Sequence, residues 1–117
     1  MNTSDFGKKG ELYARDYLER KGYSYVVGNY KKAHGEIDLI MKDGDTLVFV
    51  EVKSRRSRRY GEPVEAVNPR KQVHIKYCAQ MYVLNSRIQG KRIRFDIVEV
   101  MASPSGTVKF RHIKNAF

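Results

Sequence analysis

The residues best suited to chemistry lie in two short segments near the middle of the chain. In the first, Glu36 and Asp38 alternate with apolar residues, and in the second, Glu51 and Lys53 follow an apolar run. Successive side chains of a strand point to opposite faces, so the two members of each pair share a face. In hydrolytic sites, carboxylates bind a divalent metal ion, and a neighbouring lysine can act on the phosphodiester or on the attacking water.

The link between the two segments determines how these side chains meet. Asp43-Gly44-Asp45 is typical of a tight hairpin turn, with predicted strands over residues 36–42 and 47–53 on either side of it. The two strands are therefore expected to be antiparallel neighbours. Their charged ends should lie side by side.

Two pairings of these strands keep the charged residues together. With Asp38 opposite Glu51, the four charged side chains gather at one end of one face. A shift by two residues places Glu36 opposite Glu51 and preserves the cluster, whereas a shift by one residue would bury charge. In the first pairing, the other face of the hairpin is aliphatic and consists of Ile37, Leu39, Met41, Val48, Val50 and Val52.

Three carboxylates at such short range repel one another, and Lys53 supplies only one compensating positive charge. We therefore expect a bound Mg²⁺ or Mn²⁺, with Asp38 and Glu51 as ligands and Glu36 assisting directly or through water. Lys53 would position or activate the attacking water, or neutralise charge that develops on the phosphate. The alternative is an ordinary solvated ladder of acids and a lysine.

The balance of charge indicates a polyanionic partner. The 117 residues include 23 lysines and arginines against 13 acids, a net charge of +10, which is typical of proteins that bind nucleic acid. An anionic membrane surface or a simple contribution to solubility would explain the same excess. The candidate nucleic-acid contacts follow the acidic cluster or open the second helix, and they are Arg55, Arg56, Arg58, Arg59, Lys71 and Gln72.

The elements that position these residues are expected to form one domain over residues 1–117. Helices are predicted over residues 4–20 and, after the cap signal Asn68-Pro69, up to residue 85. Residues 54–67 are predicted to be a loop. The predicted strands cover residues 23–30, 36–42, 47–53, 91–101 and 107–113. The order α-β-β-β-α-β-β predicts an α/β fold with a central mixed five-stranded sheet flanked by helices.

The spacing of apolar residues places a set of them on one face of each helix. The set in the first helix is Phe6, Gly10, Tyr13, Ala14, Tyr17 and Leu18. The set in the second helix is Val73, Tyr77, Gln80, Met81 and Leu84. Cys78, the only cysteine, lies within the second helix and is expected to be a buried thiol rather than a nucleophile.

Several other classes of protein are disfavoured. His34, His74 and His112 form no convincing metal set, and the sequence has neither a P-loop nor a dinucleotide-binding fingerprint. The first residues lack an apolar core of signal-peptide length, and no segment has the length and apolarity of a membrane span. A cytoplasmic location is therefore expected.

The hairpin and its charged residues resemble the PD-(D/E)-x-K nuclease superfamily, which has the restriction-endonuclease-like fold. In that superfamily a first acid precedes a hairpin, and a second acid and a lysine lie on the next strand. The resemblance implies that Asp38 is the first acid, Glu51 the second and Lys53 the lysine. Ile37 stands where a proline is usual, a departure that the superfamily tolerates.

A closer similarity extends over nearly the whole chain, to the YraN-type family of small, uncharacterised bacterial proteins. It is carried by Gly10-Glu11, residues 35–40, residues 48–55, Lys71-Gln72 and Arg94-Phe95-Asp96. That family is similar to archaeal Holliday junction resolvases, whose first helix carries a glutamate near the metal site. By this resemblance Glu11 is an auxiliary metal ligand.

The resemblance implies a metal-dependent endonuclease that acts on DNA phosphodiesters. Branched or structured DNA is the favoured substrate, and a homodimer is the form in which resolvases act. Two alternatives belong to other classes of function. One is a nucleic-acid-binding module that keeps the fold without cutting, and the other is an adaptor that recruits another protein through its basic face.

Overall fold

The computed structural model describes residues 3–33, 35–57, 59, 61–87 and 91–117, with side chains from residue 9 onward. Its elements are α1 (Thr3–Arg20), β1 (Ser24–Lys32), β2 (Gly35–Asp43), β3 (Thr46–Arg55), a 3-10 helix η1 (Pro63–Ala66), α2 (Pro69–Asn85), β4 (Arg92–Ala102) and β5 (Val108–Ile113). The predicted order of helices and strands is confirmed. The predicted loop differs, because β3 extends into it and η1 forms within it. As far as the described residues show, no helix is long and apolar enough to cross a membrane.

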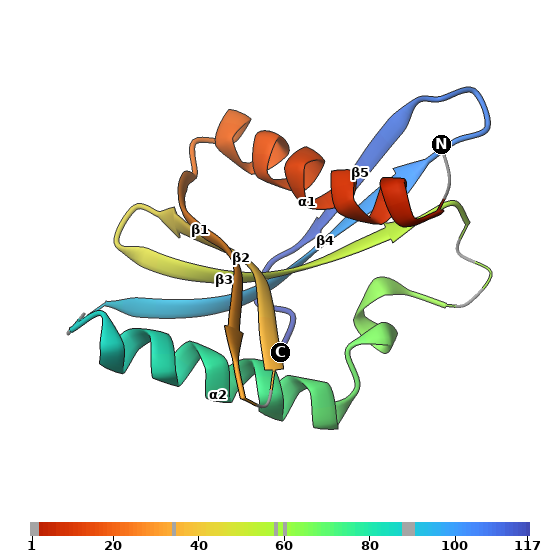
Figure 1. Ribbon diagram of the computed structural model, residues 1–117. Helices are drawn as coiled ribbons and strands as arrows, with labels where there is room; N and C mark the ends of the chain where they lie inside the picture. The colour runs from red at the N-terminus through yellow and green to blue at the C-terminus, as the bar shows by residue number, and fades with distance from the viewer. Residues whose placement is uncertain (1–2, 34, 58, 60, 88–90) are drawn as a thin grey trace.

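The five strands form one mixed sheet in the order β1-β2-β3-β4-β5. β3 and β4 are parallel, and the other neighbouring pairs are antiparallel. The parallel pair is connected through η1 and α2, because parallel neighbours need a long crossover whereas antiparallel neighbours need only a turn. α1 covers one face of the sheet and α2 covers the other (Figure 1). This arrangement is the helix-flanked mixed sheet that the sequence predicts.

α1 packs on the sheet through the face that its sequence predicts. Ala14 and Leu18 lie one helical turn apart and are fully buried. They belong to one core cluster with Met41 and Val48 of the central strands. The helix ends as predicted, since Gly22 follows it with a φ of +97°, a backbone conformation that glycine adopts without strain.

α2 begins where the sequence predicts but turns a different face to the sheet. The side chain of Asn68 caps the helix by accepting a 2.9 Å hydrogen bond from the N–H of Lys71. Val73 and Leu84 of the predicted apolar set are 65% and 64% exposed. The fully buried residues of α2 are instead Ile75, Cys78 and Ala79.

The shape of the opposing sheet explains this difference. Phe49 and Phe95 stack with ring centroids 5.5 Å apart and fill the surface under α2. Tyr82 of α2 packs edge-on against Phe49 with ring centroids 6.1 Å apart. The small side chains of Cys78 and Ala79 permit the helix to approach the sheet. The expectation of a buried thiol at Cys78 is thereby confirmed.

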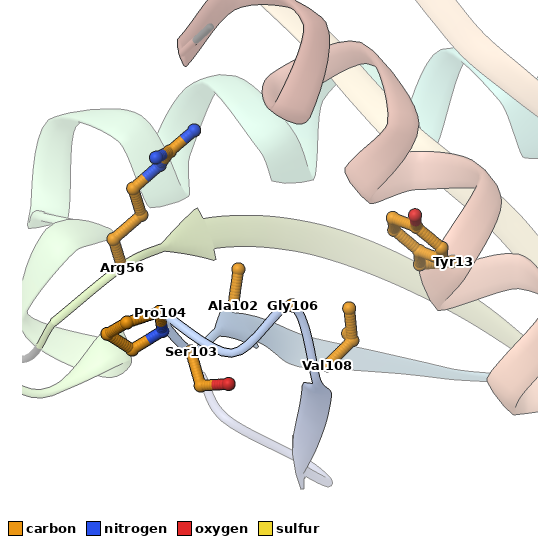
Figure 2. A pocket seen from close by; sticks show the side chains of 7 residues that line it. All are labelled: Tyr13, Arg56, Ala102, Ser103, Pro104, Gly106 and Val108. Carbon is orange, nitrogen blue, oxygen red and sulfur yellow. The ribbon is translucent and has the colours of Figure 1, made fainter. Parts of the chain in front are cut away.

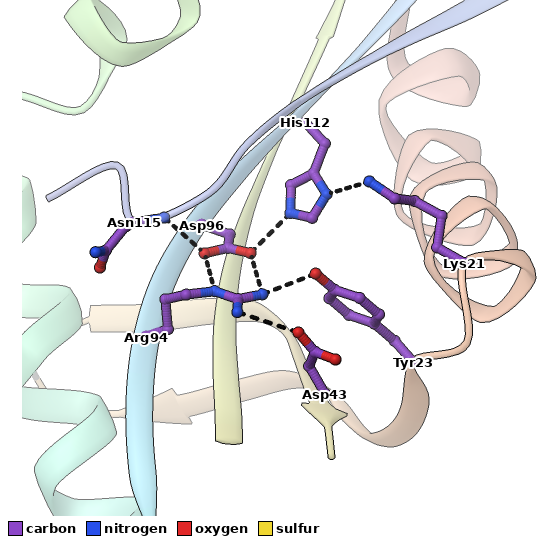
Figure 3. A network of polar contacts seen from close by, with 7 residues as sticks. All are labelled: Lys21, Tyr23, Asp43, Arg94, Asp96, His112 and Asn115. Carbon is purple, nitrogen blue, oxygen red and sulfur yellow. Dashed lines mark hydrogen bonds and ion pairs between the residues drawn. The ribbon is translucent and has the colours of Figure 1, made fainter. Parts of the chain in front are cut away.

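A buried polar network connects β4 to the segment that follows α1, to the end of β2 and to the C-terminal residues (Figure 3). Asp96 is fully buried; it accepts a 2.9 Å hydrogen bond from Nε of Arg94 and lies 2.7 Å from Nε2 of His112. Arg94 also donates to Tyr23 and Asp43 at 2.8 and 3.1 Å. The remaining members are Lys21 and the backbone N–H of Asn115. The Arg94–Asp96 pair lies on one face of β4, but the sequence does not indicate the other members, because they come from distant segments.

Candidate functional site

The β2–β3 hairpin has the first of the two predicted pairings. Leu39 lies opposite Val50 in the last backbone pair of this ladder, which is the register of the pairing that places Asp38 opposite Glu51. Beyond this last pair, the Asp38 carboxylate accepts a 2.8 Å hydrogen bond from the N–H of Val52, so a side chain continues the contact between the strands.

The first residues of β2 approach α2. A Cβ on Gly35 would lie 3.2 Å from Sγ of Cys78 and 3.3 Å from the carbonyl oxygen of His74, so glycine permits this close contact. Ile37 consequently packs in the core cluster under α2, together with Ile40. The prediction of a wholly aliphatic second face is therefore wrong at Ile37, because strict alternation holds only along the regular part of the strand.

The four predicted charged residues line one pocket, which we call the acidic pocket. It has a volume of about 420 Å³ and lies between the start of β2, the second half of β3 and the start of α2. The ionisable residues that line it are Glu36, Asp38, Glu51, Lys53, Lys71 and His74. The fold thus brings together the side chains that the hairpin pattern groups and adds two from α2.

Glu51 is the most deeply buried acid of this pocket, with only 3% of its surface exposed. Its Oε2 lies 3.5 Å from the ammonium of Lys71, whereas Oε1 is buried with no hydrogen-bond partner among the described residues. Burial, together with the nearby charge of Asp38, raises the pKa of Glu51 to about 7 against the opposing effect of Lys71 and Lys53. Such an unpartnered oxygen destabilises the fold unless a cation or water satisfies it.

Burial in the pocket also shifts the pKa values of Asp38 and Lys53. Burial raises the pKa of Asp38, although the hydrogen bond from Val52 and the charge of Lys53 act in the opposite direction. Burial and the adjacent ammonium of Lys71 lower the pKa of Lys53 to about 8. A lysine with this pKa exchanges its proton near neutral pH, as a group that accepts a proton from water must.

Glu11 of α1 lies near the acidic pocket without lining it. Gly10 permits the approach of α1, because a Cβ there would lie 1.8 Å from Oγ of Ser54 on β3. Burial and the charge of Asp38 raise the pKa of Glu11, and a hydrogen bond with Asn29 opposes them. Glu11 lines a neighbouring pocket of about 160 Å³ instead. The predicted auxiliary ligand therefore interacts electrostatically with Asp38 from a separate cavity.

The residues of the acidic pocket fit a hard divalent cation. Within the described part of the chain, no three Asp, Glu, His or Cys side chains already converge as a metal-binding group. Mg²⁺ nevertheless commonly takes one or two carboxylates and retains several waters. Asp38 and Glu51 supply such a pair, and Oε1 of Glu51 is an oxygen donor without a competing partner.

The predicted nucleic-acid contacts are dispersed. Arg55 belongs to β3, and its guanidinium donates a hydrogen bond to the carbonyl oxygen of Gly61, which anchors the following loop. Arg56 lines a separate pocket of about 270 Å³ with Tyr13 (Figure 2). Arg59 is exposed. Two residues named from the sequence, His34 and Arg58, lie outside the described residues, as does the nearby Tyr60.

Lys71 and Gln72 both lie in the first turn of α2, as predicted, but their surroundings differ. Lys71 lines the acidic pocket. The amide of Gln72 donates a 2.9 Å hydrogen bond to the carbonyl oxygen of Val67 and so secures the start of the helix. Of the two candidates in this turn, only Lys71 is placed beside the predicted metal ligands.

Two features of the pocket are absent from the sequence-based prediction. The sequence indicates a phosphate contact for Lys71, whereas the structure pairs it with Glu51. His74 also lines the pocket. Lys71 and His74 are three residues apart, so the helical repeat places them on one face of α2. The sequence could therefore predict that the two side chains are neighbours. The spacing does not reveal which part of the sheet the face meets.

Comparisons with known proteins find relatives along most of the chain. The model of the "Uncharacterised protein family UPF0102" matches residues 10–100. A UPF0102 protein from Dictyoglomus turgidum is 44% identical over 118 residues, with 100% of both chains covered. A UPF0102 protein from Syntrophus aciditrophicus is 48% identical, covering 95% of this chain and 87% of the relative. Another from Symbiobacterium thermophilum is 45% identical, covering 95% and 94% respectively. These descriptions name no activity, substrate or ligand.

Proposed function

This chain belongs to the uncharacterised protein family UPF0102, as its resemblance to YraN-type proteins predicts, and we propose that it is a metal-dependent endonuclease that hydrolyses DNA phosphodiesters in the acidic pocket. The family description names no activity. The proposal therefore rests on the chemistry of the residues that line the pocket.

One observation carries the proposal, namely that Glu51 is 3% exposed and keeps Oε1 without a partner beside Asp38 and Lys53. A buried carboxylate with one oxygen unpartnered is destabilising even when the other oxygen faces Lys71, so a side chain kept only for stability would be apolar here. A carboxylate pair that faces a pocket is instead suited to bind a divalent cation. The nearby lysine adds a group that can act on water or phosphate.

Each residue of the pocket has a distinct proposed role. Asp38 and Glu51 would hold Mg²⁺ or Mn²⁺, and Glu36 would assist directly or through water. Such an ion polarises a phosphodiester and lowers the pKa of a bound water. Lys53, whose pKa is about 8, accepts the proton of the attacking water or, when protonated, neutralises charge on the phosphate. Glu11 would act as an auxiliary group through its interaction with Asp38.

The proposed substrate follows from charge and from the family resemblance. A net charge of +10 favours a polyanion, and the exposed Arg59 together with Arg56 would contact its backbone. Similarity to Holliday junction resolvases favours branched or structured DNA. The same similarity makes a homodimer the proposed acting form, because two strands must be cut symmetrically.

Cleavage of a panel of linear, flapped and four-way DNAs with Mn²⁺ tests the proposal. The wild type should cut at least one substrate, and Lys53→Ala should cut it about a hundredfold more slowly because proton transfer from water is lost. Arg70→Ala, which removes an exposed cation at the start of α2, controls for loss of one positive charge. Equal cutting by the wild type and Lys53→Ala would contradict the proposal.

A second candidate function is DNA binding without cleavage. It is favoured by the Lys71–Glu51 ion pair, which already gives Glu51 a cationic partner. The described residues also lack a ready three-ligand group. In this case DNA should bind equally well with and without metal, and the panel should yield no product with Mn²⁺ or Mg²⁺.

A further inference from the structure

The ammonium group of Lys71 lies close enough to Glu51 to neutralise its carboxylate. The ammonium nitrogen is 3.5 Å from Oε2 of Glu51, and the two side chains are 41% and 4% exposed, respectively. The backbone of Lys71 is fixed because its N–H donates to the side chain of Asn68 at the helix start. The mobile part of the residue is therefore its flexible four-carbon side chain, which reaches the buried carboxylate from an accessible position.

The charges of the acidic pocket nearly balance with Lys71 in place. When ionised, Glu36, Asp38 and Glu51 carry three negative charges, and Lys53 and Lys71 carry two positive charges. A divalent ion would change the formal sum from −1 to +1. The two ammonium groups already lie close enough to influence each other, since burial and the proximity of Lys71 together lower the pKa of Lys53. A third cation would therefore repel both ammonium groups at short range.

We propose that Lys71 is the internal counter-ion of the metal-free pocket and that a divalent metal ion displaces its ammonium from Glu51. This inference rests on the proposed function, because it requires Glu51 to bind the metal. Lys71 has a route out, since 41% of its side chain is exposed. Rotation about the side-chain bonds moves the ammonium into solvent without moving the helix.

The displaced ammonium then becomes a phosphate-binding group. Lys71 lies in the first turn of α2, where the backbone N–H groups also favour anions. A substrate phosphate thus meets a free Lys71 only after the metal has bound. Because coupling between two binding sites is reciprocal, metal and DNA should each tighten the binding of the other.

Calorimetric titration of Mn²⁺ into the wild type, Lys71→Met and Lys76→Met tests the displacement. Methionine keeps most of the length of lysine but lacks the competing charge, so Lys71→Met should bind Mn²⁺ about fivefold more tightly than the wild type. Lys76 lies on the same helix over the rings of Phe95 and Phe117. Its replacement controls for loss of one positive charge and should leave the affinity nearly unchanged. Equal affinity in Lys71→Met and the wild type would overturn the inference.

A second measurement follows the ammonium itself. Brief labelling with an amine-reactive reagent, read by mass spectrometry, should modify Lys71 faster once Mn²⁺ is present. Lys76 serves as the internal control and should label at the same rate in both conditions. Labelling of Lys71 that Mn²⁺ does not accelerate would show that the ion pair persists and would overturn the displacement.

A third measurement tests the contact with phosphate. Ca²⁺ also takes oxygen ligands, so we would use it when measuring the affinity for a fluorescent DNA duplex. Ca²⁺ should tighten binding by the wild type, and the gain should be smaller in Lys71→Met. An equal gain in both proteins would overturn the proposed phosphate contact.

The failures of the two proposals are distinguishable. If the wild type binds no Mn²⁺ and cuts no DNA, the proposed function fails and the inference fails with it. If the wild type binds Mn²⁺ through Asp38 and cuts DNA, but Lys71→Met binds Mn²⁺ no more tightly, only the inference about Lys71 fails.

Discussion

At the scale of single residues, Glu51 has a pH-dependent effect on stability. Its pKa in the folded protein is about 7, above its usual value of 4.5, because burial and Asp38 disfavour the charged form. The metal-free fold therefore has the full stabilising contribution of this group below about pH 4.5 and loses it as the pH rises through about 7.

Glu51→Gln should remove this dependence, because the amide stays neutral. We expect the metal-free variant to exceed the wild type in free energy of unfolding by about 1–3 kcal/mol at pH 8, and by much less at pH 4.5. Urea denaturation in the presence of a chelator measures both values. Glu65→Gln, at an exposed position outside the pocket, is the control. A difference that does not grow between the two pH values would contradict the environment described for Glu51.

At the scale of elements, Gly10 determines how closely α1 approaches β3. A Cβ at this position would lie 1.8 Å from Oγ and 3.2 Å from Cβ of Ser54. Alanine favours a helix by about 1 kcal/mol over glycine, but overpacking of this severity costs about 1–3 kcal/mol. Steric overlap should therefore outweigh helix propensity.

Gly10→Ala should accordingly lower the free energy of unfolding by about 1 kcal/mol. Chemical denaturation measures the loss. The double variant Gly10→Ala/Ser54→Ala should recover part of it, since the closest atom is removed while Cβ of residue 54 remains. A single variant as stable as the wild type would show that α1 can move away from β3 at no cost.

The assignment of the buried face of α2 leads to another prediction. Ile75→Ala should cost about 2–4 kcal/mol because it opens a cavity in the core, Ile75 being 2% exposed. Leu84→Ala should change stability by less than about 0.5 kcal/mol, because Leu84 is 64% exposed. Denaturation of both variants under one condition compares them. Similar losses would mean that the face predicted from the sequence is packed after all.

Features of this fold that depend on neighbouring residues could be predicted from the sequence, whereas features that depend on distant segments could not. The cap at Asn68-Pro69 and the turn at Asp43-Gly44-Asp45 act on their own segments, so the elements and the hairpin could be predicted. The buried face of α2 could not, because it depends on the surface of the sheet that the helix meets, which includes Phe49 and Phe95. Apolar spacing within the helix carries no information about that surface.

The same distinction applies to the candidate site. Asp38, Glu51 and Lys53 belong to one hairpin, so alternation and register predict that they gather. Lys71 comes from α2, and its pairing with Glu51 depends on where the crossover places that helix. Charge and helix position could indicate a phosphate contact for Lys71, but no local signal identifies its partner.

At the scale of the whole molecule, the network around Asp96 joins β4 to the segment after α1, to the end of β2 and to the C-terminal residues (Figure 3). Burial alone would raise the pKa of Asp96, but hydrogen bonds from His112, Arg94 and the N–H of Asn115 outweigh it and lower the pKa. Arg94 in turn contacts Asp43 at the end of β2. The carboxylate therefore stabilises several elements at once.

Asp96→Ala should be severely destabilising. It leaves Arg94 and His112, whose side chains are only 18% and 3% exposed, without their shared partner, and we expect a loss of about 3–5 kcal/mol. Asp45→Ala is the matched control, because the Asp45 side chain is 95% exposed and pairs with Lys91; its loss should stay below about 1 kcal/mol. Urea denaturation compares the two variants. A loss at Asp96 no greater than at Asp45 would contradict a structural role for the network.

The central claim is that the buried carboxylates of β2 and β3 form a metal site. Calorimetric titration of Mn²⁺ into the wild type and Asp38→Ala, at pH 6 and pH 8, tests it most directly. We expect one site in the wild type that is weaker at pH 6, because Glu51, with a pKa of about 7, must release its proton to bind metal. Asp38→Ala should show no such site. Equal binding by the two proteins, or no binding by the wild type at either pH, would contradict the account.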